Sequence, residues 1–428
     1  AANGGDDRPS ASTLSDPDEI ASDGTRLFVS DAGNHRVLVW NTFPQYNRQP
    51  ADLVVGQESF DDAVLAGGAM QLARPRGLFL DGPRLLVTGA GGDNCVFGLN
   101  APPAQNNPYQ DFQIGTDTVG QRAVTEHIFP IPTALSGFGA GGLAVRDRIG
   151  MRVSVFRTMP RTADAPSSFA LGRPDRFVGG NDVGGVSAST IASGDERAGL
   201  FAGHGVVLVP DETRLLVWRT TPGYDGAPAD LVIGQPSFVT AERGVDYRGV
   251  GRETLSHPSG VHEAEGARAV ADRANNRVLL TRGAGAAAST VVLGQATGEA
   301  YAPNRNWQSP SAASLNAPED AFVEGGRLYV ADTGNHRVLV WNSLPTADGQ
   351  PADLVVGQAD FAGTRPNRGA GDGDGDGDSD ASAGGFFYPS ALAVEGGRLF
   401  VSDTGNHRVL VFSPLPGASG AEASDVLG

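Results

Sequence analysis

The sequence predicts an all-β protein, a single closed β-propeller of seven four-stranded antiparallel blades. Three observations support this fold. Similar segments recur about every 60 residues, a second short signature follows each of them, and apolar residues within each copy alternate with the period of two that is typical of strands.

The first signature is plainest in three copies. LFVSDAGNHRVLVWNTFP begins at Leu27, and the segments that begin at Leu328 and Leu399 match it without a gap. Degenerate copies align on the position of Arg36. The seven aligned positions are Arg36, Asn94, Arg152, Arg214, Arg277, Arg337 and Arg408, separated by 58, 58, 62, 63, 60 and 71 residues. Each interval is long enough for a four-stranded blade with long loops.

The second signature gives the same count. It reads ADLVVGQ from Ala51, and its counterparts begin at Phe112, Phe169, Ala229, Thr290 and Ala352, with SDVLG at the C-terminus. In the first copy we expect strands at 19–22, 26–31, 36–41 and 51–57, with turns at 23–25 and 32–34. The turns contain Gly, Asn and Asp, which accept positive φ. Each such meander leaves apolar faces that only neighbouring copies can cover, so the copies should stack in a ring.

The chain divides into an N-terminal extension over residues 1–13 and a propeller over residues 14–428. An acidic insertion at residues 369–385 reads GAGDGDGDGDSDASAGG and falls in the longest interval. Asp372, Asp374 and Asp376 reproduce the first half of a calcium-binding loop, but Ala383 stands where that loop has its bidentate Glu. The insertion is therefore either a flexible acidic loop or one ordered by Ca²⁺, and the sequence makes no cofactor certain.

Composition excludes several classes of function. A net charge of −17 and a pI near 4.8 argue against nucleic acid and against anionic membranes as partners. The chain contains no lysine, which excludes Schiff-base chemistry, and its one cysteine, Cys95, allows no internal disulfide. No apolar run reaches the ~18 residues of a membrane helix. The sequence opens at Ala1 without Met, from which we expect export to a secreted, periplasmic or cell-surface location.

The VSDAGNHRVLVW segments, with Asp31, the Asn34-His35 pair and Arg36 at these offsets, resemble the NHL repeat. The trailing ADLVxGQ resembles its long bacterial variant. NHL propellers usually have six blades, so six is the alternative to the seven copies counted here. The copy at residues 193–218 departs most from the pattern, because Val209 stands in its Asp position.

The recurring Asp, His and Arg look catalytic but are expected to be structural. A motif that repeats in several blades lies at several separated places around the ring, whereas chemistry needs one convergent cluster. We expect the Asp to accept turn N–H groups and the Arg to pair with a carboxylate or carbonyl, within a blade and between blades.

Proline precedes most of the innermost strands, and the residues beside it are candidates for ligand binding. In a propeller these entry loops lie near the axis, on the face where ligands commonly bind. The candidates are Asp16, Asp18, Glu19, Arg74, Arg76, His257, His262, Glu319, Asp320 and Tyr388. Carboxylates and imidazoles near one axis can hold Ca²⁺ or Zn²⁺, and the alternative is that they are solvated or paired with one another.

The first hypothesis for function is an exported, non-enzymatic binding module. Its loops around the central channel would be presented to a protein or glycan partner, or to another copy of the chain. The second is a metal-dependent lyase or hydrolase with its site over the channel, because the chain resembles NHL propellers and some of these, such as the peptidyl amidating lyases, do chemistry there. The third is a structural subunit of an extracellular assembly.

Overall fold

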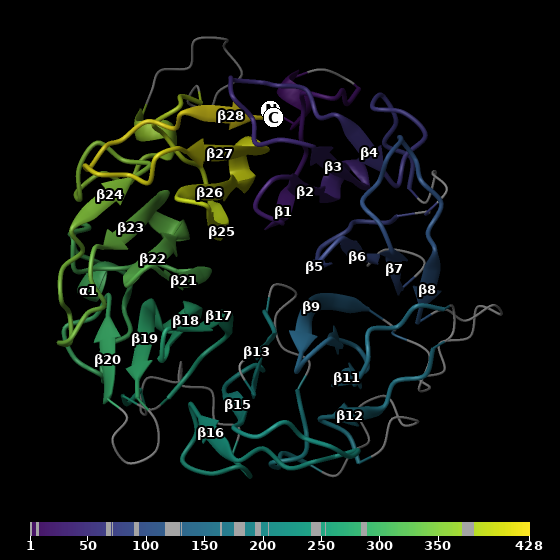
Figure 1. Ribbon diagram of the computed structural model, residues 1–428. Helices are drawn as coiled ribbons and strands as arrows, with labels where there is room; N and C mark the ends of the chain where they lie inside the picture. The colour runs from purple at the N-terminus through teal and green to yellow at the C-terminus, as the bar shows by residue number, and fades with distance from the viewer. Residues whose placement is uncertain are drawn as a thin grey trace.

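The computed structural model is a ring of seven four-stranded antiparallel blades (Figure 1). This confirms seven blades rather than six. The strands of every blade follow sequence order from the axis outward, so β1 at the N-terminus is innermost and β28 at the C-terminus is outermost. The structure describes residues 2–5, 8–65, 70, 72–89, 94–115, 129, 131–162, 165–174, 185–192, 198–203, 205–240, 250–252, 254–283, 289–369 and 381–428.

Each blade has its inner strand first and its outer strand last. Blades 1 and 2 contain β1 (Pro17–Ser22), β2 (Leu27–Asp31), β3 (Arg36–Trp40), β4 (Leu53–Val55), β5 (Leu78–Asp81), β6 (Arg84–Gly89), β7 (Cys95–Leu99) and β8 (Phe112–Ile114). Blades 3 and 4 contain β9 (Pro132–Phe138), β10 (Gly142–Asp147), β11 (Arg152–Phe156), β12 (Phe169–Leu171), β13 (Phe201–Gly203), β14 (Val206–Pro210), β15 (Leu215–Trp218) and β16 (Leu231–Ile233).

The remaining blades follow the same plan. Blades 5, 6 and 7 contain β17 (Pro258–Ala264), β18 (Ala267–Asp272), β19 (Arg277–Arg282), β20 (Ser289–Leu293), β21 (Asp320–Glu324), β22 (Arg327–Asp332), β23 (Arg337–Trp341), β24 (Leu354–Val356), β25 (Pro389–Glu395), β26 (Arg398–Asp403), β27 (Arg408–Phe412) and β28 (Asp425–Leu427). The aligned arginine position thus begins a third strand, or directly precedes one, in every blade.

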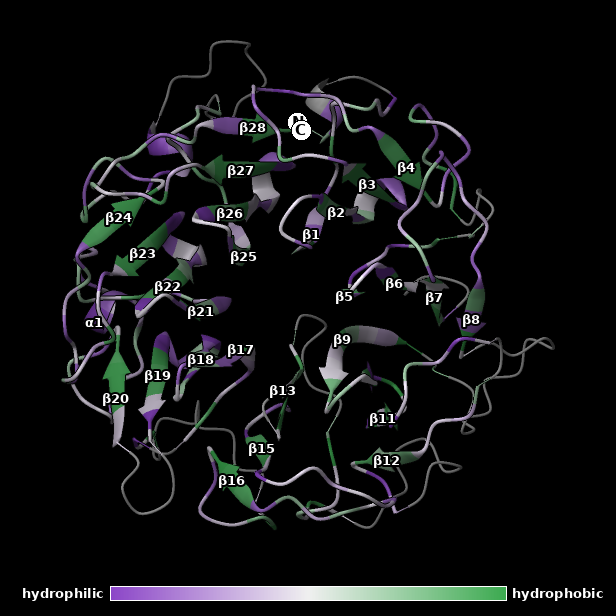
Figure 2. Ribbon diagram, in the orientation of Figure 1, coloured by the Kyte–Doolittle hydropathy of each residue, from purple (hydrophilic) through white to green (hydrophobic). Residues whose placement is uncertain are grey.

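Apolar residues from adjacent blades form the core. The buried clusters of the described residues lie between neighbouring blades, and one of them joins blade 7 to blade 1. Trp40, Trp218 and Trp341, at one repeat position, are each 1% exposed, and Cys95 is fully buried. Figure 2 shows this arrangement, with outer strands such as β20 and β24 apolar and inner strands such as β17 and β21 more polar. Blade stacking therefore supplies the hydrophobic stabilisation of the ring.

The repeated polar motif forms a buried ion pair at the second turn of every blade except blade 2. In blade 1, Asp31 accepts a hydrogen bond from the backbone N–H of Ser15 (2.6 Å), and its second oxygen accepts from Asn34 (2.8 Å) and from Nε of Arg36 (2.7 Å). Arg36 also donates to the carbonyls of Ser10 and Thr13 at 2.9 and 2.8 Å. Blades 5, 6 and 7 repeat the pair as Asp272–Arg277, Asp332–Arg337 and Asp403–Arg408.

The structural role expected for this motif is therefore confirmed, and blade 4 achieves it by another route. Val209 lies on β14 in the usual Asp position, but Asp211 lies closer to the arginine and accepts from Nε of Arg214 at 2.8 Å. In blade 2 the two positions hold Gly89 and Asn94, and neither can form the pair.

The outer edge of a blade is covered by a loop of the next blade. Gly349, in the loop between β23 and β24 of blade 6, donates its backbone N–H to Val292 on β20 of blade 5 at 2.7 Å. The ring closes in the same way, because Arg48 of blade 1 donates to Val426 on β28 at 2.7 Å and the Val426 N–H donates to Asn47 at 3.0 Å. These contacts occupy edge groups that would otherwise be free to pair with another chain.

Residues near the N-terminus make contacts that recur in blade 6. Asn3 accepts a hydrogen bond from Asn34 at 2.8 Å, as Asn304 does from Asn335 at 2.8 Å. The carbonyl of Ser10 accepts a hydrogen bond from Arg36 of blade 1. The carbonyl of Ser311 accepts the equivalent bond from Arg337 of blade 6. The N-terminal segment thus occupies the place of an inter-blade loop, beside the C-terminus (Figure 1).

Candidate functional site

Two hollows lie along the axis of the ring. The first, which we call the channel cavity, has a volume of about 230 Å³ and is lined by residues on or beside the inner strands of all seven blades. The second, which we call the channel mouth, has a volume of about 660 Å³ and lies where the chain enters the inner strands. Arg76 and Glu319 line both hollows, so the cavity opens toward the mouth.

Nine of the ten candidate residues line these hollows. Asp16, Arg74 and Tyr388 line the mouth. Asp18, Glu19, His262 and Asp320 line the cavity, and Arg76 and Glu319 line both hollows. His257 does not line either one. Its backbone N–H donates to the carbonyl of Glu212 (2.8 Å), and its Nδ1 lies 3.3 Å from the Ser256 hydroxyl.

The charges at the mouth form ion pairs. Arg74 contacts Asp16 at 3.0 Å, and Arg76 contacts Asp18 at 3.5 Å, each pair joining blade 2 to blade 1. A third pair, at 3.4 Å, joins Arg273 of blade 5 to Glu319 of blade 6. The sequence analysis missed Arg273, which directly follows the motif Asp272 in a turn where the closest NHL copies have Ala or Thr. That departure from the repeat was the signal that could have found it.

The motif histidines hold the mouth residues in place. In each of four blades, a side chain in the left-handed conformation accepts a hydrogen bond from the backbone N–H that precedes the entry proline of the next blade. The bonded pairs are His35 with Arg74 (3.1 Å), Asn276 with Ala317 (2.7 Å), His336 with Tyr388 (3.2 Å) and His407 with Asp16 (3.0 Å). We call these contacts latches, and the last one closes the ring between blades 7 and 1.

Each latch holds a residue in a conformation that it would rarely adopt alone. Asp16, Arg74 and Tyr388 have φ of 51°, 46° and 52°, in the left-handed region that only a few per cent of residues other than Gly adopt. Such backbone strain persists only where surrounding contacts enforce it. The latches therefore orient the three side chains that line the mouth.

The latches should make stability depend on pH. Burial lowers the pKa of His336 to about 4, because the charged imidazolium is poorly solvated there and protonation of Nδ1 removes the acceptor of the latch. The unfolded state binds the proton more readily, so stability is fully present above pH 6.5 and is lost as the pH falls toward 4. For this one residue we expect a loss of about 3 kcal/mol by pH 4, measured by urea unfolding at a series of pH values.

The chain contains its own control for this prediction. Asn276 occupies the same position in blade 5 and forms the same latch through its Oδ1, which does not titrate. The variant His336→Asn should therefore keep the stability of the wild type at pH 7.5 and lose less of it by pH 4. An unchanged pH profile in this variant would contradict the role given to the latch.

Carboxylates and aromatic rings face each other across the channel cavity. Burial, followed by the charges of Asp18 and Asp320, raises the pKa of Glu19 to about 8. Burial also raises the pKa of Asp320 to about 6, although backbone hydrogen bonds from Leu392 (3.0 Å) and Ala321 (2.8 Å) oppose the shift. Glu19 is exposed to the channel, yet protein surrounds it on all sides, so little water stabilises its charge.

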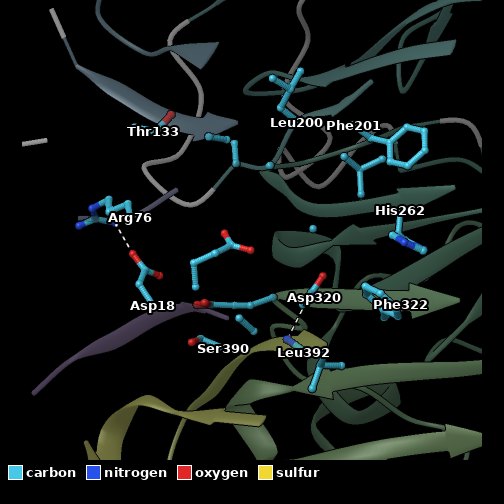
Figure 3. Close-up of a pocket in the computed structure, with 18 of the residues that line it drawn as sticks. Asp18, Arg76, Thr133, Leu200, Phe201, His262, Asp320, Phe322, Ser390 and Leu392 are labelled. Atoms are coloured by element: carbon cyan, nitrogen blue, oxygen red, sulfur yellow. Dashed lines mark hydrogen bonds and ion pairs between the residues drawn. The ribbon is translucent and has the colours of Figure 1, made fainter. Parts of the chain in front are cut away.

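The aromatic side of the cavity is built by three blades. The His262 ring stacks on Phe322 with centroids 4.0 Å apart and meets Phe201 edge-on at 6.0 Å. Figure 3 shows these rings on one side of the pocket, Asp18 and Arg76 on the other, and Asp320 between them. The backbone N–H of Val323 donates to His262 Nδ1 at 3.3 Å, so the ring proton of the neutral tautomer is on Nε2.

Among the described residues, no group of three or more His, Cys, Asp or Glu side chains is arranged to hold a metal ion. Asp372, Asp374 and Asp376 lie outside the described residues, so the calcium site proposed for the insertion stays a prediction. Trp307 of the short helix α1 (Pro303–Trp307) is 79% exposed.

Comparisons with known proteins agree with this architecture. The family model described as NHL repeat matches residues 315–341 and 386–412. The hydrazine synthase of Kuenenia stuttgartiensis is similar with a TM-score of 0.53 and 11% identity, over 93% of this chain and 96% of that chain. At this identity the likeness shows the fold alone.

Two further solved structures are more distant in shape. Virginiamycin B lyase from Staphylococcus aureus has a TM-score of 0.47 at 10% identity, covering 90% of this chain and 91% of its own. The periplasmic gluconolactonase PpgL from Pseudomonas aeruginosa has a TM-score of 0.48 at 14% identity, with 82% and 87% covered.

A search of curated proteins found no match to the sequence. Within the described residues, no helix has both the length and the apolar character needed to cross a membrane. The repeat motif, its role at the blade turns and the match to the family model all point to one assignment. The chain is a seven-bladed β-propeller that contains NHL repeats.

Proposed function

We propose that the chain is an exported, non-enzymatic binding propeller that presents its channel mouth to a protein or glycan partner. The observation that carries the proposal is the convergence of mouth side chains from several blades, held by latches in strained backbone conformations. A rigid set of polar groups loses little conformational freedom on binding, which favours affinity.

The chemistry of the mouth supports recognition of a polar surface. Tyr388 is 49% exposed and packs against His336 with ring centroids 4.6 Å apart, so its ring forms a fixed platform. In the same mouth, Arg74 contacts Asp16 through one nitrogen while 47% of its side chain stays exposed. Tyrosine and arginine are enriched where proteins bind partners, and a guanidinium that uses one donor retains others for a ligand.

The test screens glycan and peptide arrays with the wild type and then measures the best ligand against variants. Arg74→Ala and Tyr388→Ala should each weaken binding by tenfold or more, as expected for central interface residues. The control is Tyr224→Ala, because Tyr224 is 62% exposed and lies in a loop between β15 and β16, on the opposite face. Loss of binding in the control alone, with both mouth variants unaffected, would contradict the proposal.

The other parts of the proposal have separate tests. Fractionation of cells that express the protein from its natural gene would test export. Metal analysis of the purified chain would test the enzyme alternative, since stoichiometric zinc removable by a chelator supports it and calcium alone supports a structural role. Sedimentation would test self-association and the structural-subunit alternative.

A further inference from the structure

The channel cavity carries an excess of negative charge. Four carboxylates line it, from Asp18, Glu19, Glu319 and Asp320, against the single arginine Arg76. Asp18 and Glu319 each contact an arginine, whereas Glu19 and Asp320 have no ion-pair partner among the described residues. The cavity therefore attracts a cation more strongly than it attracts an anion or a neutral molecule.

The two carboxylates without an arginine partner come from different blades. Glu19 lies on β1, where its backbone N–H donates to the Ser30 hydroxyl at 2.7 Å and its side chain is exposed to the channel. Asp320 begins β21, and its hydrogen bond from Leu392 ties it to blade 7. The position of Asp320 is thus set by two blades, and its charge adds to the field at Glu19.

The aromatic wall indicates what kind of cation fits. Phe201, His262 and Phe322 all line the cavity, from blades 4, 5 and 6. Aromatic faces attract ammonium and guanidinium groups, and more strongly where water is excluded. A metal ion instead needs several oxygen or nitrogen ligands around one point, and the described residues offer no such group.

We propose that the channel cavity binds a small organic cation, an alkylammonium or alkylguanidinium group, between the carboxylates of Glu19 and Asp320 and the aromatic wall of Phe201, His262 and Phe322. The volume of about 230 Å³ is below the roughly 300–1,000 Å³ of sites for drug-sized ligands, so the occupant is small. It is either a free molecule or the side chain of a partner that enters through the mouth. This inference goes beyond the proposed function, because a free cation binds without any contact at the mouth.

Binding should be linked to proton release. Glu19 faces Asp18, Asp320, Glu319, Arg76 and His262 across the cavity, and with a pKa of about 8 it is largely protonated at pH 7. A bound cation favours the ionised carboxylate and lowers that pKa. The affinity should therefore rise between pH 6 and pH 9, and the measured heat should depend on the ionisation enthalpy of the buffer.

The experiment is isothermal titration calorimetry of the full chain at pH 8.5. Butylammonium and butylguanidinium should bind saturably, and 1-butanol, the neutral analogue, should not. The peptide acetyl-Gly-Lys-Gly-amide separates the two sources: saturable binding of this peptide indicates a partner side chain, and binding of the free amines alone indicates a small molecule. Tyr388 lines the mouth but not the cavity, so Tyr388→Ala should leave butylammonium binding unchanged. A failure of the proposed binding at the mouth can therefore be distinguished from a failure of the proposed binding in the cavity.

Variants of the cavity decide the outcome. Glu19→Gln should weaken butylammonium binding by tenfold or more and remove most of its pH dependence, and Phe322→Leu should weaken it severalfold. The control is Asp81→Asn, since Asp81 lies on the inner strand β5 but outside the cavity and pairs with Arg84 at 2.5 Å. Equal binding of 1-butanol, an unaffected Glu19→Gln variant, or displacement of butylammonium by one equivalent of Ca²⁺ would overturn the proposal.

Discussion

Replacement of Arg337 by methionine is expected to lower the free energy of unfolding by about 3–5 kcal/mol, the range found when one partner of a buried ion pair is removed. Asp332 would remain fully buried with its charge uncompensated. The carbonyls of Phe361, Ser311 and Ser314, which accept from this guanidinium at 2.6, 3.0 and 2.8 Å, would lose their donor. Equilibrium urea unfolding measures the loss as a lower midpoint.

An exposed pair of the same chemistry is the control. Arg26 contacts Asp23 at 2.5 Å, but the two side chains are 21% and 16% exposed, so Arg26→Met should cost less than about 1 kcal/mol. The double variant Asp332→Asn with Arg337→Met should be more stable than Arg337→Met alone, because it buries no unpaired charge. Equal losses in Arg337→Met and Arg26→Met would refute the account of the motif.

Replacement of Gly357 by alanine should destabilise the ring by about 2–4 kcal/mol. Gly357 has a φ of +90°, and a Cβ placed there would overlap the ring of Phe386, which is fully buried between blades 6 and 7. The cost combines a conformation that alanine rarely adopts with overpacking of a dense interface, which typically costs about 1–3 kcal/mol. The urea midpoint again measures the effect.

Gly397 separates the two contributions. Its φ is +73°, but nothing lies within 4 Å of a Cβ at that position, so Gly397→Ala tests the conformational cost alone. We expect a loss of about 1 kcal/mol for this variant. If both variants lost the same amount, packing against Phe386 would not be the reason for the glycine. The same packing explains the glycine of the second signature elsewhere, since Gly56 and Gly294 lie against Leu72 and Leu315.

The architecture was predictable because it repeats. One alignment on the position of Arg36 placed all seven third strands, and the Gly and Asn positions placed most of the turns between strands. The shifted ion pair of blade 4 was not predictable from the alignment, because Asp211 reaches Arg214 from a different position of the turn. A carboxylate can reach the same arginine from more than one backbone position. An alignment that compares the copies position by position does not detect such a shift.

The candidate site was only partly predictable. Proline marked the entries to the inner strands, so the residues beside it were placed near the axis correctly, with His257 as the one that lines neither hollow. Arg273 and the aromatic wall of Phe201 and Phe322 were missed. The departure of Arg273 from the Ala or Thr of the closest copies could have indicated it. Phe201 and Phe322 occupy ordinary strand positions, and nothing local shows that their side chains face the axis.

The order of the strands within a blade and the structural role of the Asp and Arg of the motif follow from the sequence alone, which also favours seven blades over six. These are local properties, repeated in each copy and independent of what lies across the ring. Only the tertiary structure decided which side chains meet at the axis, that His336 latches Tyr388, and that Glu19 and Asp320 share one cavity. Closure of the ring brings together residues about 300 positions apart, such as Glu19 and Asp320, and their mutual field exists only once the last blade contacts the first.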